Sequence, residues 1–286
     1  MQYTLRQLLD EGDKRLRAAG IENPRLAAEV ILRKILGLRK IDLYLEPRQE
    51  ISSQQTTEYY SHIERKLARE PLQYIVGETE WFGMIIKCDR RALIPRPETE
   101  IIVERALEGL AAVKNPRVAD IGTGTGCIAI AVVHSRPDAA LFATDVSADA
   151  LELAKENISL HRLADKINLQ QGNLLEPLMT LEKFDLIIAN LPYVRDFEYP
   201  TLMPEVRAHE PQGALVAGSD GLDFIRPLIE KAPRILSSQG ILVLEHGADQ
   251  FSAVTAIGKK TGSYSSIEKI ADYNHLDRGA ILIKTS

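Results

Sequence analysis

From about Ile101 to its end, the chain alternates short apolar segments with longer amphipathic ones, and no other feature constrains the fold as strongly. Segments of helical length and period, such as Ser147–Leu160 and Leu222–Leu236, separate most of the apolar segments. This alternation is typical of an α/β fold, in which helices cover both faces of a mostly parallel sheet and ligands bind at the carboxyl ends of its strands. The predicted strands are Arg117–Ile121, Ala140–Asp145, Lys166–Gln171, Phe184–Asn190, Gly240–Glu245, Ser266–Ala271 and Gly279–Lys284.

The first 70 residues show helical periodicity and no strand alternation. Thr4 is a capping residue before one helix, and Asn23-Pro24 supplies a cap and a first-turn proline for a second. A third helix is predicted from about Ser52. Residues 1–70 are therefore expected to form a small helical bundle.

Residues 71–100 differ from both neighbouring regions. Tyr74–Val76 and Trp81–Ile86 are predicted to be short β-strands joined by a turn at Gly77. We expect a β-hairpin linker here, followed by a segment beside the ligand site. The chain would then divide into domains 1–70, 71–100 and 101–286.

The charge distribution argues against a bare nucleic acid as partner. Net charge is −5, with 13 basic and 11 acidic residues among the first 70 and 22 basic and 29 acidic residues in the remainder. Proteins that grip long nucleic acids usually carry a basic excess, because neutralisation of phosphates supplies most of the affinity. No direct nucleic-acid binding is therefore expected.

Other classes of protein are disfavoured by features that the sequence lacks. No stretch approaches the roughly 20 continuous apolar residues of a transmembrane helix, and the first residues do not have the layout of a signal peptide. Cys88 and Cys127 are not in a CxxC spacing, which predicts neither a disulfide framework nor a zinc site. His134, His161 and His209 show no metal-ligand spacing. We expect a cytoplasmic protein without a membrane anchor or a metal.

A glycine-rich turn follows the first predicted strand of the α/β region. Its small residues let a ligand approach the backbone, and the helix start at Cys127 offers N–H groups to a carboxylate. Dinucleotide-binding turns have the pattern G-x-G-x-x-G, whereas this one has G-x-G-x-G. Asp120, near the end of the strand, offers nothing to a pyrophosphate but attracts the positively charged amino group of S-adenosylmethionine. That cofactor is therefore predicted to bind the turn formed by Gly122, Thr123, Gly124, Thr125 and Gly126.

Asp145 ends the next predicted strand, 25 positions after Asp120. An acid at this position can accept hydrogen bonds from both ribose hydroxyls of an adenosine. The alternatives are a tight strand-to-helix turn without a ligand and a nicotinamide-binding turn. The two strand-end acids together favour S-adenosylmethionine.

Asn190-Leu191-Pro192-Tyr193 follows a buried strand and is predicted to carry the chemistry. In this fold that strand lies beside the first one, so the tetrapeptide would face the methyl group of the cofactor. Amides and aromatic-ring amines are poor nucleophiles because their lone pair is delocalised. The Asn190 side-chain oxygen and the Pro192 carbonyl can accept the two N–H bonds of a planar NH2 and orient its nitrogen. Tyr193 can stack on the planar acceptor. By itself, Asn-x-Pro-Tyr is also an ordinary strand-ending turn.

These motifs resemble the family of protein-(glutamine-N(5)) methyltransferases that modify peptide chain release factors, often called PrmC or HemK. The resemblance covers nearly the whole chain. Its most specific string is Ile94–Glu100, which general methyltransferases do not carry. Further matching segments, in the family's order, are Pro71–Gly77, Glu210-Pro211, Gly218–Asp223 and Asp277-Arg278.

The resemblance implies a Rossmann-like class I methyltransferase domain with a seven-stranded sheet. Its acceptor would be the glutamine of the Gly-Gly-Gln loop of release factors, which act in translation termination. The helical N-terminal domain and the hairpin would hold the release factor, and a monomer is expected. Asn190, Pro192 and Tyr193 would be catalytic, and Leu191 would join them in contacting the substrate. The cofactor site would comprise Asp120, Gly122, Thr123, Gly124, Thr125, Gly126, Asp145, Leu174 and Asn190.

Three positions depart from the family pattern. Leu191 replaces the usual proline, Glu245-His246-Gly247 replaces the common Glu-Ile-Gly, and Asn173-Leu174 stands where an acid is frequent.

Because Asn-Leu-Pro-Tyr also occurs in ribosomal RNA adenine dimethyltransferases, the main alternative is an RNA or DNA methyltransferase acting on an exocyclic amine. A cofactor-binding regulator without catalysis is the other alternative. Arg96 is either a salt-bridge partner or a functional group.

Overall fold

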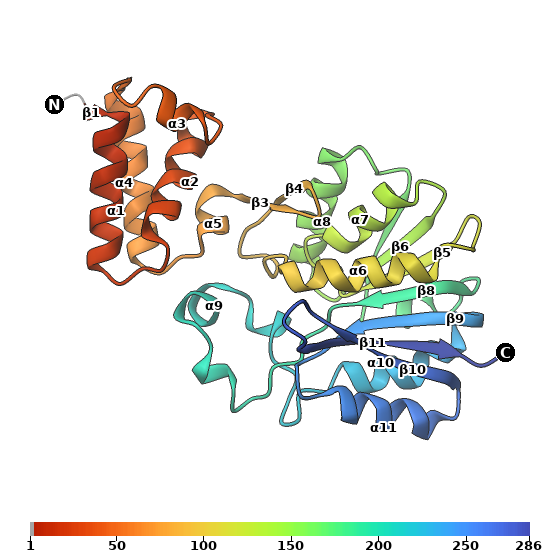
Figure 1. Cartoon of the computed structure of the whole chain (residues 1–286). Helices are drawn as coiled ribbons and strands as arrows, with labels where there is room; N and C mark the ends of the chain where they lie inside the picture. Colours follow the sequence, from red (N-terminus) through yellow and green to blue (C-terminus); the bar gives the residue numbers. More distant parts are fainter. Residues whose placement is uncertain (1–2) are drawn as a thin grey trace. The chain divides into compact units, whose positions relative to one another are not determined.

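A computed structural model describes residues 3–286 and divides the chain into two compact units (Figure 1). The helical unit contains the residues up to Glu78 together with Met203–His209. The sheet unit contains Thr79–Leu202 and Glu210–Ser286. The short helix α9 (Pro204–His209) thus belongs to the helical unit although it lies far along the sequence.

The helical unit is the small bundle that the periodicity predicts. Its core contains Leu8 of α1 (Leu5–Ala18), Ile31 of α2 (Pro24–Leu36) and Tyr59 of α4 (Ser53–Leu67), all fully buried. Arg69 pairs with Glu205 of α9 within this unit. The unit also contains the short helices α3 (Asp42–Leu45) and α5 (Leu72–Val76). Strand β1 (Tyr3–Thr4) is antiparallel to β2 (Glu50–Ile51).

The helix starts follow the predicted capping residues, with one difference. Thr4 and Gln7 form a capping box at α1, and Ser52 and Gln55 form another at α4. Helix α2 begins at Pro24 as predicted, but the side chain of Asn23 makes no capping hydrogen bond. Asn23 instead takes a left-handed conformation with φ of 48° and turns the chain into the helix.

The predicted strand Tyr74–Val76 is wrong, because these residues belong to the short helix α5. An apolar run of three residues has no readable period, and here it is buried in the core of the helical unit. Gly77, with φ of 78°, ends the helix. The hairpin lies just after it, in β3 (Glu78–Trp81) and β4 (Met84–Lys87), so its turn is at Phe82-Gly83, inside the segment Trp81–Ile86 that was predicted to be one strand.

The sheet unit contains the predicted seven-stranded sheet, in the order β10-β11-β9-β8-β5-β6-β7. The pairs formed by β5 with β6, β5 with β8, β6 with β7 and β8 with β9 are parallel, whereas β11 is antiparallel to both of its neighbours. The predicted mostly parallel α/β fold is confirmed. The strands are β5 (Arg117–Ile121), β6 (Ala140–Asp145), β7 (Ile167–Gln171), β8 (Phe184–Ala189), β9 (Leu236–Glu245), β10 (Tyr264–Ala271) and β11 (Asp277–Lys284).

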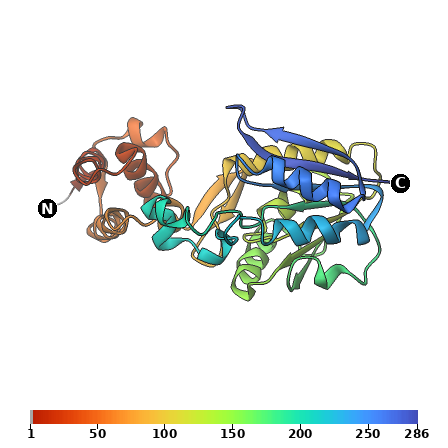
Figure 2. The same ribbon diagram turned by 90° about the horizontal axis from the view of Figure 1, so that it is seen from below.

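Helices cover both faces of this sheet (Figures 1 and 2). On one face lie α6 (Pro97–Gly109), α7 (Cys127–Ser135) and α8 (Ala148–Leu160), and on the other lie α10 (Ile225–Lys231) and α11 (Phe251–Thr261). The two apolar layers enclose the central strands, which explains why β8 reads as a nearly continuous apolar run.

The helix predicted over Leu222–Leu236 is shorter in the structure. Helix α10 covers only Ile225–Lys231, a 3₁₀ turn follows at Ala232–Arg234, and β9 already begins at Leu236 instead of Gly240. Pro233 lacks an N–H and restricts the residue before it, so the α-helix cannot continue through this point.

Candidate functional site

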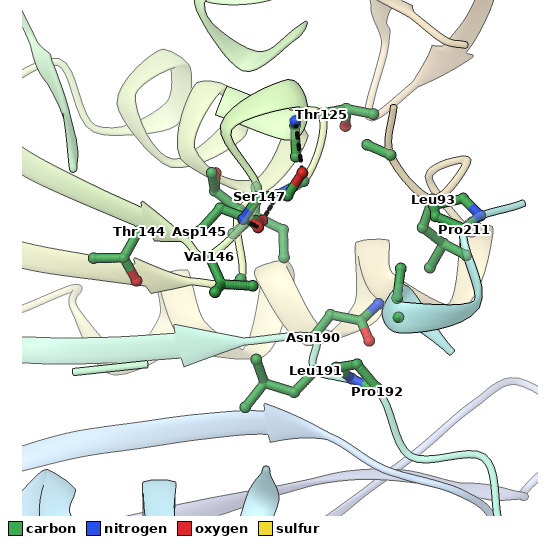
Figure 3. Close-up of a pocket in the computed structure, with 18 of the residues that line it drawn as sticks. Leu93, Thr125, Thr144, Asp145, Val146, Ser147, Asn190, Leu191, Pro192 and Pro211 are labelled. Atoms are coloured by element: carbon green, nitrogen blue, oxygen red, sulfur yellow. Dashed lines mark hydrogen bonds between the residues drawn. The ribbon is translucent and has the colours of Figure 1, made fainter. Parts of the chain in front are cut away.

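The site lies where β5 and β8 end side by side. Ile121, the last residue of β5, is paired with Ala189, the last residue of β8. The glycine-rich turn and the Asn190 tetrapeptide therefore leave the sheet next to each other, at the carboxyl edge where open α/β sheets bind ligands. A cavity of about 330 Å³ opens there, inside the sheet unit. In Figure 3, Asn190, Leu191 and Pro192 lie across it from Asp145, Val146 and Ser147.

The glycine-rich turn needs its glycines for two physical reasons. Gly122, Gly124 and Gly126 have φ of 74°, 54° and 81°, a region that residues with a Cβ rarely adopt. At Gly122 a Cβ would also lie 2.8 Å from Cδ2 of Leu191. The turn and the tetrapeptide are thus in close contact, and a side chain at position 122 would force them apart.

Asn157 of α8, fully buried, ties this turn to the hairpin. Its Nδ2 donates to the Thr125 carbonyl at 2.9 Å and to the Lys87 carbonyl at 3.1 Å. Its Oδ1 accepts from the Lys87 N–H at 2.8 Å. One amide side chain therefore links β4, α8 and the glycine-rich turn.

Asp145 lies in the cavity wall with both carboxylate oxygens already engaged. Oδ2 accepts from the Gly124 N–H and Oδ1 from the Ser147 N–H, each at 2.9 Å. A carboxylate has about four lone-pair sites, so two remain for a ligand. The backbone contacts fix the direction of the side chain before any ligand arrives.

Asp120 is not in the cavity wall. The side chain is fully buried beneath the turn, where Oδ2 accepts from Thr123 Oγ1 at 2.6 Å and from the Ala129 N–H at 3.2 Å. Burial raises the pKa of Asp120 to about 7. The sequence analysis predicted that Asp120 contacts the ligand. In the structure its hydrogen bonds go to the turn and to the start of α7. Gly126 likewise lies behind the wall, against Ala154.

Leu174 lines the cavity and adopts an unusual backbone conformation. Its φ is 50°, and its carbonyl accepts a hydrogen bond of 3.0 Å from Thr144 Oγ1. The positive φ costs energy in a residue with a Cβ, and the Thr144 bond offsets part of that cost. Asn173 and Leu174, the pair that stands where the family often has an acid, thus both line the cavity without supplying a carboxylate.

The tetrapeptide divides between the wall and the interior. Asn190, Leu191 and Pro192 line the cavity, whereas Tyr193 does not. The Tyr193 hydroxyl instead donates to Glu245 Oε1 at 3.2 Å, and burial raises its pKa. The stacking position predicted for Tyr193 is thus not part of the cavity wall.

Two polar residues beside the tetrapeptide, Thr99 and Glu245, are not among the site residues predicted from the sequence. Thr99 accepts from Asn190 Nδ2 at 2.9 Å and donates to Glu245 Oε2 at 2.6 Å. Both Thr99 and Glu245 are 2% exposed, and burial raises the pKa of Glu245 to about 7. The sequence does indicate a role for Thr99 near the site, because Thr99 lies within Ile94–Glu100, the most specific segment of the family resemblance.

A third wall of the cavity comes from the segments around Leu93 and Pro211 (Figure 3). Glu210 joins these segments, because it accepts from Arg96 Nη2 at 2.6 Å and from the Ile94 N–H at 3.2 Å. Of the two roles considered for Arg96, the structure shows a salt bridge.

Cys127 and His246, two further side chains that could take part in chemistry, are buried. Cys127 is buried at the start of α7, and burial raises its pKa. His246 is buried against Phe251, with Nδ1 close to the Gly247 carbonyl. Among residues 3–286, no three His, Cys, Asp or Glu side chains are arranged to hold a metal ion.

Comparisons with known proteins identify the family. Residues 7–77 match the family described as PrmC N-terminal domain, and residues 99–205 match the methyltransferase small domain. The release factor glutamine methyltransferase of Moorella thermoacetica is 40% identical over 96% of this chain and 96% of its own length. That of Deinococcus radiodurans is 43% identical over 84% of this chain and 85% of its own length. The chain belongs to the release factor glutamine methyltransferase family. The resemblance noted in the sequence is thus confirmed.

Solved structures agree with this fold for the methyltransferase. A methyltransferase from Pyrococcus furiosus superposes with a TM-score of 0.54 at 18% identity, covering 82% of this chain and 100% of its own. In the described part of the chain, no helix has both the length and the apolar content to span a membrane.

Proposed function

We propose that the chain transfers a methyl group from S-adenosylmethionine to the side-chain amide nitrogen of the glutamine in the Gly-Gly-Gln motif of peptide chain release factors. Family membership supports the substrate class, since the relatives carry the name release factor glutamine methyltransferase. The observation that carries the proposal is the position of Asn190, which lies in the cavity wall opposite Asp145 with its Nδ2 already bonded to Thr99.

The residues of the cavity fit the proposed cofactor. Asp145 would accept the ribose hydroxyls through its two unused lone-pair sites. The apolar side chains of Val146 and Leu174, both in the wall, would contact the adenine. The backbone of Gly122–Gly126 would face the methionine part, and Asp120 would contribute through its hold on Thr123.

Asn190 and Pro192 would prepare the acceptor. The Asn190 Oδ1 and the Pro192 carbonyl would accept the two N–H bonds of the glutamine amide, which increases electron density on its nitrogen and fixes its direction. In the described part of the chain, no hydrogen bond uses either of these two oxygens. When bound, S-adenosylmethionine would supply an electrophilic methyl group, and Asn190 and Pro192 would direct the amide nitrogen toward it, with one amide proton lost to solvent on methylation.

The other roles follow from the same arrangement. Leu191 would contact the substrate from the wall, and Tyr193 would support the tetrapeptide through its bond to Glu245. The helical unit and the hairpin would recognise the body of the release factor. The protein would act as a monomer in the cytoplasm, where its substrate takes part in translation.

Mass spectrometry tests the reaction directly. Purified release factor is incubated with the protein and S-adenosylmethionine, and the peptide containing Gly-Gly-Gln is sequenced by fragmentation. We expect the mass of one added methylene group on the glutamine and none on a release factor with alanine in its place. An unmodified glutamine, together with methylation of RNA or DNA under the same conditions, would establish the nucleic-acid alternative.

A further inference from the structure

A chain of hydrogen bonds runs from Asn190 through Thr99, both in the cavity wall, to Glu245, which is not in the wall. It starts at Asn190 Nδ2, passes through Thr99 Oγ1 over 2.9 Å and reaches Glu245 Oε2 over 2.6 Å. Tyr193 joins the other carboxylate oxygen over 3.2 Å. Thr99 lies in the first turn of α6, and Glu245 is the last residue of β9. Three elements distant in sequence thus meet behind the tetrapeptide.

While Glu245 is ionised, the chemistry of these groups fixes the direction of every hydrogen bond. An ionised carboxylate can only accept, so Glu245 must receive its hydrogens from Thr99 and Tyr193. A hydroxyl has a single hydrogen, so once Thr99 donates to Glu245 it can only accept from Asn190. The group of Asn190 that faces Thr99 must then be its NH2, and Oδ1 must face the other way.

We propose that Thr99 and Glu245 are positioning residues that hold the Asn190 amide with its oxygen toward the methyl acceptor. The two ends of an asparagine amide are nearly equal in size, so packing alone does not select one orientation. A flipped Asn190 would present an NH2 to the NH2 of the glutamine, and the two donors would repel. This inference rests on the proposed function, because it concerns the oxygen that binds the glutamine amide.

The buried position of the pair strengthens the argument. Thr99 and Glu245 are each 2% exposed, and although Thr99 lines the cavity, little of either side chain is accessible to a competing water molecule. A buried carboxylate is costly unless donors compensate it, and the two hydroxyls supply part of that compensation. A carboxylate at position 245 accepts from both hydroxyls and so fixes the direction of the hydrogen bonds, which accounts for a charged residue being buried here.

Two substitutions at Thr99 separate orientation from packing. Thr99→Val keeps the shape of the side chain but removes the hydroxyl, whereas Thr99→Ser keeps the hydroxyl. We expect Thr99→Val to lower kcat by about tenfold or more, with KM for release factor and Kd for S-adenosylmethionine within about threefold of wild type. Thr99→Ser should recover most of the lost turnover. A kcat of Thr99→Val equal to that of wild type would overturn the inference.

A double-mutant cycle shows whether Thr99 acts through Asn190. Asn190→Ala removes the oriented group, so adding Thr99→Val to it should cause no further loss of kcat. Losses that multiply would mean that Thr99 acts by another route and would overturn the inference. Thermal unfolding of each variant checks the fold, and Glu245→Gln provides the same cycle from the far end of the chain if Thr99→Val does not fold. A wild-type protein that leaves glutamine unmethylated would instead refute the proposed function, so the two failures are distinguishable.

Discussion

The two sides of the cavity are built on different principles. On the cofactor side, Asp145 is held by the N–H groups of Gly124 and Ser147, which lie within about one strand–turn–helix unit of it. On the acceptor side, Asn190 is held by Thr99 and, through it, by Glu245, which lie 91 and 55 positions away along the chain. The first side is local and uses backbone donors, whereas the second depends on side chains from remote elements.

This difference affects how each side tolerates substitution. A backbone N–H is present in almost any residue, so the orientation of Asp145 depends mainly on the shape of the turn. The acceptor side loses its directionality as soon as one hydroxyl or carboxylate in the chain is replaced. Mutations should therefore affect cofactor binding on one side and turnover on the other.

The largest effect is expected for Asn190. Asn190→Ala removes one acceptor of the substrate amide, and we expect turnover to fall by about 10²-fold or more while the Kd for S-adenosylmethionine stays within several-fold of wild type. Asn190→Asp should not restore activity, because its charge stabilises the cationic ground state more than the transition state. Single-turnover kinetics and calorimetry measure the two quantities.

The exposed Asn168 of β7 offers a matched control for these variants. Asn168→Ala should leave both turnover and affinity at the wild-type level. Near-normal turnover in Asn190→Ala would refute the proposed role of the tetrapeptide.

The next effect concerns the cofactor side. Asp145→Ala should weaken binding of S-adenosylmethionine by roughly 1.5–3 kcal/mol, on the order of tenfold or more, because it removes a charged acceptor and leaves two backbone N–H groups without their partner. Isothermal calorimetry measures the change, and Asp149→Ala, in the exposed first turn of α8, serves as control. Unchanged affinity in a folded Asp145→Ala would exclude this residue from the cofactor site.

A pH profile compares the buried acids of the two sides. Burial raises the pKa of Glu245 to about 7, and Tyr193, Glu98 and Arg278 are the titratable groups that act on it. Since a protonated Glu245 can donate to Thr99 and reverse the hydrogen bonds, turnover should fall as the pH drops through 7, by roughly tenfold between pH 8 and pH 6. Stability should change in the opposite sense. The folded state binds this proton more tightly than the unfolded chain, so the free energy of unfolding falls as the pH rises through 7.

Variants assign this acid limb, because Asp120 also has a pKa raised to about 7. Glu245→Gln should abolish the fall of kcat at low pH, whereas Asp120→Asn should retain it. The reverse pattern would transfer the pH dependence to the cofactor side.

The smallest effect is expected at the contact between the two sides. Leu191→Pro introduces the usual residue of the family next to Gly122. Only the Asn190 side chain and the Pro192 carbonyl are proposed to bind the amide, so kcat should change by at most about threefold, a shift below about 0.7 kcal/mol. Steady-state kinetics would detect a larger change, which would indicate that Leu191 itself shapes the acceptor site.

The same contrast explains what could be predicted from the sequence. The sheet, the glycine-rich turn and Asp145 follow from local patterns of apolar residues, glycines and strand-end acids. The tetrapeptide was also recognisable, because it follows a buried strand. Glu245 is recognisable in the sequence as the end of a strand and as part of a family segment, but nothing local indicates that its carboxylate meets a threonine 146 positions earlier.

Two features of the structure depend on tertiary packing and not on local sequence. Tyr74–Val76 is too short for its period to separate helix from strand, and its burial in the helical unit decided the outcome. The position of Asp120 beneath the turn could not be read either, because a strand-end acid can point into a cavity or under a loop with the same sequence. Tertiary packing settles both cases.

The side chain of Asn157 has a consequence for motion. Its bonds to Lys87 and Thr125 mean that the end of the hairpin and the glycine-rich turn cannot separate from α8 one at a time without leaving a buried amide unpaired. In hydrogen exchange, the Lys87 amide and the amides of the turn should therefore exchange at similar rates, as one cooperative unit. A protein bound to the hairpin would slow that opening and so hold the cofactor turn in place without touching it.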